Sequence, residues 1–192
     1  MNKLMARVGA TIVIFQVLLF ILSWIFSAMR LEGVRSLLSS EGIRWFFGAF
    51  AGNVASSWLV SLLLILIALG ALQKSGIFDG GRGYRDRIAL RVSIIVLCLF
   101  GMVVGLLTLP PHAILLSATG ELFPSAFSRS LLPIITFAVS LFAVVFGMMS
   151  GRLNTLSDIL DALSNGLSHS APLVVIAILL IQFIASLGFV FN

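Results

Sequence analysis

Charge is scarce in this sequence. Only 10% of the 192 residues are Asp, Glu, Lys or Arg, whereas soluble domains carry about 25%, so the chain cannot build a water-soluble surface. Hydrophobic residues make up 60%, which places the protein in a membrane. The sequence has one cysteine, Cys98, which excludes an intrachain disulfide. Because Cys98 lies within an apolar run, we interpret it as a small apolar filler.

The sequence also lacks residue patterns typical of catalysis or metal binding. The two histidines, His112 and His169, are expected on opposite faces of the membrane, and neither has a cysteine or carboxylate cluster beside it, which argues against zinc. Asp158 and Asp161 share one helix face, but a solvated face accounts for them better than acid–base chemistry does. We predict no enzyme, no catalytic residue, no metal and no cofactor.

Long apolar runs are what the sequence has in abundance. About 20 apolar residues in a helix span the roughly 30 Å hydrocarbon core of a bilayer. We predict five crossings, at about residues 8–29, 54–73, 88–109, 131–150 and 171–191. Two shorter segments, at about 39–50 and 155–169, are predicted as interfacial amphipathic helices. The predicted fold is an all-α integral membrane protein in which residues 1–192 form a single helical membrane domain.

Local signals mark two helix ends. Thr155-x-x-Asp158 is a capping-box pattern, which predicts the start of the second interfacial helix. Lys74 followed by Gly76 is typical of a helix end, and it places the stop of the second crossing.

Basic residues orient the crossings. The side that holds the N-terminus collects eight of the twelve, namely Lys3, Arg7, Lys74, Arg82, Arg85, Arg87, Arg91 and Arg152. The other side collects four, namely Arg30, Arg35, Arg44 and Arg129. The positive-inside rule then places the N-terminus in the cytoplasm and the C-terminus outside a cell (inner or plasma) membrane. The first run exceeds the 7–15 residues typical of the apolar core of a signal peptide, so we expect it to remain as a crossing.

Polar residues in or beside the runs are the candidates for facing a solute. We single out Gln16, Asn53 and Gln182, although helix–helix hydrogen bonds, or a local cap in the case of Asn53, account for them better. No acidic residue, Lys or His falls in the middle of a run, and no run shows the interrupted helix that is typical of secondary transporters. Gly101 and Gly105 form a GxxxG pattern that permits close helix packing, though chance accounts for it equally well.

Short segments along the chain resemble the p-aminobenzoyl-glutamate transporter (AbgT) family. They are Ser39-Ser40-Glu41-Gly42-Ile43-Arg44-Trp45, Leu72-Gln73-Lys74-Ser75-Gly76-Ile77, Pro124-Ser125-Ala126-Phe127, Leu132-Pro133-Ile134-Ile135, Phe146-Gly147, Ser157-Asp158 and Ile181-Gln182-Phe183-Ile184-Ala185. The resemblance implies the inner, dimerising scaffold of that family. The family's two hairpin regions, which hold substrate and ions, are absent, so we expect a shortened member and carry over no binding residue.

Two functions remain open. The first is the scaffold or oligomerisation part of an AbgT-type secondary transporter, supporting transmembrane transport of a small organic anion as an oligomer or with a partner membrane protein. The alternative is a non-transporting membrane interaction or assembly protein that reuses the scaffold. We expect a homo-oligomer, with a dimer favoured, in the lipid bilayer. No nucleic-acid partner is predicted, because topology explains the clustering of basic residues in one loop.

Overall fold

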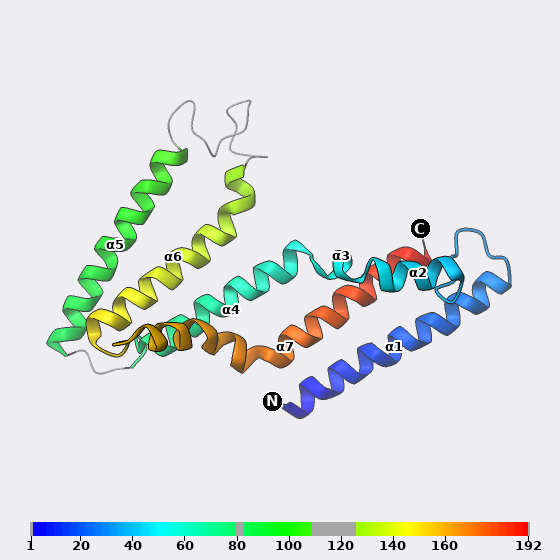
Figure 1. Ribbon diagram of the computed structural model, residues 1–192, viewed down its shortest axis with the longest axis horizontal. Coiled ribbons are helices and arrows are strands. Elements are labelled where there is room, and N and C mark those ends of the chain that lie inside the picture. The colour runs from blue at the N-terminus through cyan, green and yellow to red at the C-terminus, as the bar shows by residue number, and fades with distance from the viewer. Residues whose placement is uncertain (1, 80–82, 109–125, 192) are drawn as a thin grey trace. The chain divides into compact units, whose positions relative to one another are not determined.

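The computed structural model describes residues 2–79, 83–108 and 126–191. Within these ranges the chain forms seven helices and no strand (Figure 1). Five of the described helices are long and apolar enough to cross a membrane, so the protein is an all-α integral membrane protein, as the sequence predicted. By its contacts the chain divides into two compact units, a division that the prediction of a single domain over residues 1–192 did not include.

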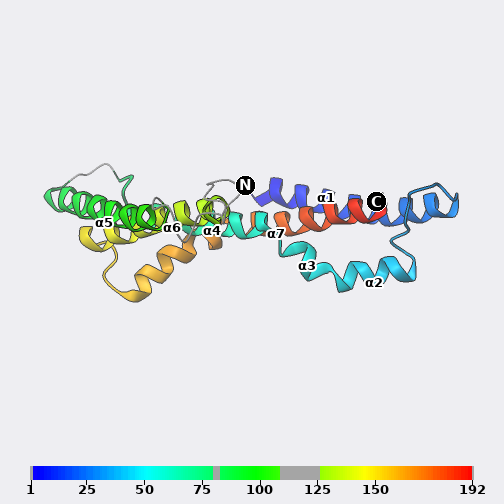
Figure 2. The same cartoon turned by 90° about the horizontal axis from the view of Figure 1, so that it is seen from above.

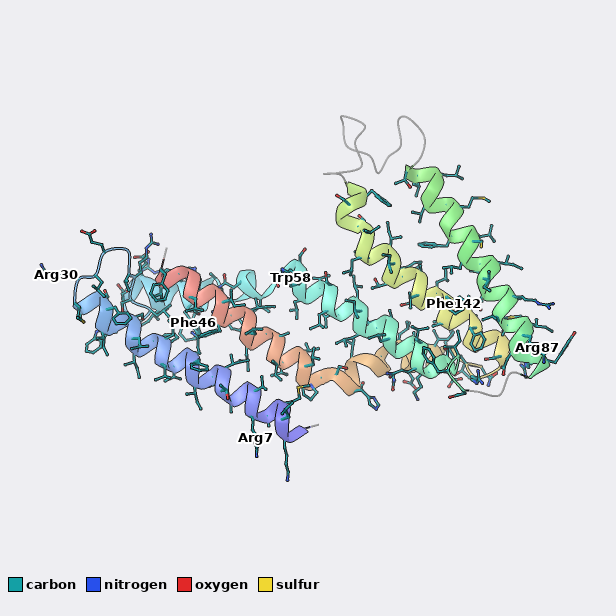
Figure 3. All side chains as sticks on the ribbon, turned by 180° about the vertical axis from the view of Figure 1, so that it is seen from behind. Arg7, Arg30, Phe46, Trp58, Arg87 and Phe142 are labelled. Carbon is teal, nitrogen blue, oxygen red and sulfur yellow. The ribbon has the colours of Figure 1, made fainter. Side chains whose placement is uncertain are left out.

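Unit 1 comprises Met1–Leu62 and Ser170–Asn192. Its helices are α1 (Asn2–Ala28), α2 (Ser40–Gly48), α3 (Phe50–Val54), the start of α4 (Ser57–Ser75) and the C-terminal part of α7 (Leu156–Val190). Its buried core consists of Leu19, Leu37 and Val190. The Phe46 ring of α2 lies edge-on to Phe20 of α1, with centroids 5.0 Å apart (Figure 3).

The chain between α1 and α4 is broken twice. Ser39 caps α2 by accepting a hydrogen bond from the Gly42 N–H at 3.0 Å. Gly42 is required there, because a Cβ would lie 2.6 Å from the Leu37 Cα. The chain leaves the helix at Ala55, and α4 begins at Ser57, after Ser56 accepts a hydrogen bond from the Leu59 N–H at 3.4 Å. The second crossing therefore starts after the predicted residue 54.

Unit 2 comprises Leu63–His169. It contains the rest of α4, α5 (Tyr84–Thr108), α6 (Ala126–Ser150) and the start of α7. Helices α5 and α6 pack along each other (Figures 1 and 2). Both predicted helix-end signals are confirmed. Helix α4 ends at Ser75 before Gly76, whose φ is +70°. At the start of α7, the Thr155 hydroxyl accepts from the Asp158 N–H at 3.1 Å, and the Asp158 carboxylate accepts from the Thr155 N–H at 2.8 Å.

Helix α7 differs from the prediction. The segments 155–169 and 171–191, predicted as two helices, belong to one helix, Leu156–Val190, which contains Pro172. A proline removes one backbone hydrogen bond, and membrane helices tolerate this because neighbouring groups satisfy the freed carbonyl. Helix α6 begins at Ala126, ahead of the predicted residue 131. His112 and the predicted end of the third crossing at residue 109 lie outside the described residues.

Candidate functional site

The three polar residues singled out from the sequence lie together in unit 1. The Gln16 Nε2 of α1 donates a hydrogen bond to the Ser186 Oγ of α7 at 3.1 Å. The Ser186 hydroxyl donates to the Gln182 carbonyl at 2.8 Å, and the Asn53 Nδ2 of α3 donates to the Gln182 Oε1 at 3.4 Å. We call these four residues the polar cluster. It joins α1, α3 and α7 through neutral groups.

The path of α2 and α3 along α7 brings Asn53 to this place. The Trp45 ring of α2 stacks on Phe189 of α7, with centroids 4.5 Å apart, and Asn53 meets Gln182. From the first contact to the second, the residue number rises from 45 to 53 in α2 and α3 and falls from 189 to 182 in α7. The α2–α3 segment therefore runs antiparallel to α7 over about 10 Å, at 1.5 Å per residue. The segment predicted as an interfacial helix at 39–50 therefore packs against a membrane-spanning helix. The sequence analysis did not predict this contact.

The polar cluster lies at the middle of two predicted crossings. Gln16 is central in residues 8–29, and Gln182 is central in residues 171–191. The unwound residues Ala55 and Ser56 follow Asn53 by two and three positions. This break lies at the start of the second predicted crossing, residues 54–73, and α4 is continuous from Ser57 to Ser75.

Burial gives the polar cluster its energetic weight. Gln182 is 4% exposed and Ser186 is fully buried. Among the described residues, the buried Gln16 Oε1 and Gln182 Nε2 have no hydrogen-bond partner. Each unpaired amide atom costs about 1–3 kcal/mol when buried. One is an acceptor and the other a donor, and a small neutral molecule that both donates and accepts, such as water, has the complementary chemistry.

Several other polar residues inside the runs bind to the backbone. The Leu37 N–H donates to the Ser23 Oγ at 3.1 Å, which fixes the segment after α1 to that helix. The hydroxyls of Ser93, Thr136 and Ser140 donate to carbonyls one turn earlier in their own helices. These groups therefore satisfy the backbone and leave the polar cluster as the meeting point of polar side chains from several helices in unit 1.

For Gly101, the first glycine of the predicted GxxxG pattern, the described residues show no close contact within the chain. A Cβ on Gly101 would meet nothing within 4 Å. The close helix contact in unit 2 is instead made by Gly70 of α4 and Gly166 of α7. A Cβ on Gly70 would lie 2.7 Å from the Gly166 Cα, and one on Gly166 would lie 2.9 Å from the Gly70 N. This pair was not predicted from the sequence, although Gly70, Ala162 and Gly166 at the contact are the small residues that permit close helix packing.

Comparison with known proteins identifies similar chains. The model of the family described as "AbgT putative transporter family" matches residues 83–190, which includes the resembling segments from Pro124 to Ala185 but not those from Ser39 to Ile77. Among solved structures, the chain is similar to the Alcanivorax borkumensis YdaH transporter, with a TM-score of 0.76 and 14% sequence identity. The match covers 95% of this chain and 70% of that chain, and at this identity it concerns the fold. The comparison with curated proteins found no match.

Proposed function

The chain belongs to the AbgT transporter family, and we propose that it is the membrane scaffold of an AbgT-type transport system for a small organic anion. In this proposal it acts as a homo-oligomer or with a partner membrane protein. It sits in the cell (inner or plasma) membrane with its N-terminus in the cytoplasm and its C-terminus outside. Its role is structural support of transport rather than catalysis.

The polar cluster is the observation that carries this proposal. Its amides and hydroxyl bind one another across α1, α3 and α7. An organic anion needs a cationic partner or several N–H donors. The four residues of the cluster bear no charge, and among the described residues the one buried amide nitrogen of the cluster without any partner is the Gln182 Nε2. The cluster is therefore better suited to holding helices together than to binding an anion.

A carrier function for this chain alone is the second candidate. It is favoured by the unwound Ala55 and Ser56 beside the polar cluster, because interrupted helices near the bilayer midplane hold solutes in secondary transporters. The two candidates differ in one measurable respect. A scaffold passes no solute by itself, whereas a carrier shows saturable uptake when it is the only protein present.

Two measurements test the proposal together. The purified chain is reconstituted in liposomes, and uptake of labelled p-aminobenzoyl-glutamate, a small organic anion, is compared with protein-free liposomes. We expect equal uptake. In parallel, the gene is deleted from its own cell, and we expect anion uptake to fall and to return with the wild-type chain. Saturable uptake by the chain alone supports the carrier instead. Unchanged uptake in the deletion strain supports the non-transporting assembly protein.

A further inference from the structure

Unit 2 contains a pocket of about 260 Å³ at the start of α5. Its charged lining residues are Asp79, Asp86, Arg87 and Arg91, and its apolar wall includes Leu90 and Phe146. We call it the α5 pocket. The polar cluster belongs to unit 1, so the α5 pocket is a separate feature.

Two arginines of the α5 pocket are free to bind an anion. Arg87 and Arg91 are four residues apart on α5, which places them on one face of the helix. Arg87 is labelled at the start of α5 in Figure 3. Both side chains are exposed. Within residues 2–79, 83–108 and 126–191, neither guanidinium forms an ion pair. Two guanidiniums one turn apart can both donate to the oxygens of one phosphate group.

The acidic side chains of the pocket do not cancel this charge. Asp86 pairs with Arg152, whose Nη1 lies 3.8 Å from the carboxylate. Arg152 is held in place because it donates to the Ser75 carbonyl at 3.3 Å and lies 5.8 Å from the centre of the Phe146 ring. Of the remaining charged residues in the lining, Asp79 is negative and Arg87 and Arg91 are positive, so the net charge of these three residues is positive.

Gly76 makes room for this arrangement. A Cβ on Gly76 would lie 2.6 Å from the Arg152 Nε, and its φ of +70° also disfavours other residues. The same glycine lines the pocket. The observed position of Arg152, in which it pairs with Asp86, therefore fits a glycine at the end of α4.

The depth of the α5 pocket in the bilayer follows from its neighbours. Tyr84, the first residue of α5, is 82% exposed, and aromatic residues at helix ends favour the headgroup zone. Arg91 lies seven residues further along, about 10 Å at 1.5 Å per residue, inside the predicted crossing that begins at Ile88. The pocket therefore extends from the headgroup zone to the edge of the hydrocarbon core.

We propose that the α5 pocket binds the phosphate group of an anionic phospholipid. Arg87 and Arg91 hold the phosphate, and Leu90 and Phe146 contact the glycerol backbone and the first methylene groups of the acyl chains. Basic pockets between membrane helices on the cytoplasmic side bind anionic headgroups in this way. The proposal does not depend on the scaffold function.

Native mass spectrometry of the full chain in mild detergent tests this assignment. The lipid probes are phosphatidylglycerol and the zwitterionic phosphatidylcholine. The test variant is Arg87→Gln/Arg91→Gln. The matched control, Arg35→Gln/Arg44→Gln, removes the same charge from two exposed arginines of unit 1. We expect the wild type and the control to retain phosphatidylglycerol about thirty-fold more strongly than the test variant, since each of the two arginines near the surface contributes about five- to sixfold. Equal retention by the test variant overturns the proposal.

Two further measurements complete the test. The first distinguishes a lipid phosphate from a free phosphate, and the second keeps the proposal testable if the double arginine variant fails to fold. Inorganic phosphate and glycerol 3-phosphate at millimolar concentration are expected to leave phosphatidylglycerol bound. Displacement by either would assign the pocket to a free phosphate and overturn the lipid proposal. The Asp79→Asn variant removes the unpaired negative charge without removing an arginine, so we expect it to retain phosphatidylglycerol more strongly than the wild type. Weaker retention by Asp79→Asn contradicts the assignment, even if the double arginine variant fails to fold.

Discussion

At the middle of a bilayer, an amide side chain is satisfied only by another protein group or by an enclosed polar molecule. Gln16 and Gln182 meet this condition in part. Each uses one amide atom in a hydrogen bond between helices, and each leaves its other amide atom unpaired among the described residues. The cluster therefore contributes the stabilisation from its hydrogen bonds minus the cost of its unpaired amide atoms. A double-mutant cycle measures the contribution of one of these hydrogen bonds.

We predict a coupling of about 0.6 kcal/mol between Gln16 and Ser186, the average for hydrogen bonds between membrane helices. The cycle consists of Gln16→Leu, Ser186→Ala and the double variant, and the free energy of unfolding is measured by denaturant titration in mild detergent. The control cycle combines Gln16→Leu with Ser140→Ala, whose hydroxyl binds within its own helix in unit 2. The control should be additive within about 0.3–0.5 kcal/mol. A Gln16–Ser186 coupling no larger than this would contradict a stabilising bond.

The sequence predicted the members of the polar cluster better than the cluster itself. Gln16 and Gln182 are conspicuous because each is an amide in an apolar run. That they meet around Ser186 depends on how α1 and α7 align, and helical periodicity carries no information about alignment between distant helices. Asn53 was predicted beside the start of a crossing, and its contact with Gln182 requires the antiparallel path of α2 and α3, which no local signal encodes.

Among the elements, the boundaries marked by side-chain chemistry were predictable. Thr155 with Asp158, and Gly76 after Lys74, each satisfy backbone groups at a helix end, so the sequence states where the helix stops. The break at Ala55 and the continuity of α7 through Pro172 were not predictable in this way. In a membrane helix, the free-energy cost of a break or of a proline depends on whether neighbouring helices satisfy the freed backbone groups. Those helices are distant in the chain, so the local sequence does not reveal the cost.

The contact between α4 and α7 in unit 2 gives a prediction for a single methyl group. In Gly166→Ala the new Cβ would lie 2.8 Å from the Leu66 carbonyl carbon and 2.9 Å from the Gly70 N. Both neighbours are backbone, which cannot move aside as a side chain can. We therefore expect the variant to lose about 1–3 kcal/mol of unfolding free energy, as in overpacked cores, measured by unfolding followed with circular dichroism.

Gly101→Ala is the matched control for this contact. Position 101 is also helical, but its Cβ would meet nothing within 4 Å. Alanine is favoured over glycine in a helix by up to about 1 kcal/mol, so the control is expected to unfold at the same temperature as the wild type or higher. Equal loss of stability in both variants would contradict the assignment of the loss in Gly166→Ala to the Gly70–Gly166 contact.

The orientation of the whole molecule is predicted by its charge distribution and tested by single cysteines. The background Cys98→Ser removes the only thiol. Glu32→Cys, between α1 and α2, should react with a membrane-impermeant maleimide on intact cells. Gly83→Cys, between α4 and α5, has open space around its Cβ and should react only after permeabilisation. The reverse pattern would mean that the eight basic residues on the N-terminal side do not face the cytoplasm.

Association of the whole molecule is the last prediction, and Gly101 provides the probe. Because nothing among the described residues lies within 4 Å of its Cβ position, we expect the monomer to tolerate a leucine there, so that the leucine interferes only with another copy packed on α5. We expect the wild type to have twice the chain mass of 20.6 kDa in mild detergent, by light scattering coupled to size exclusion. Gly101→Leu should lower the dimer fraction while the chain stays folded. Val103→Leu adds bulk at a nearby exposed position about 200° around the helix and should leave the dimer intact. A wild type that is monomeric throughout, or equal effects of both variants, would exclude the Gly101 face of α5 as the dimer contact.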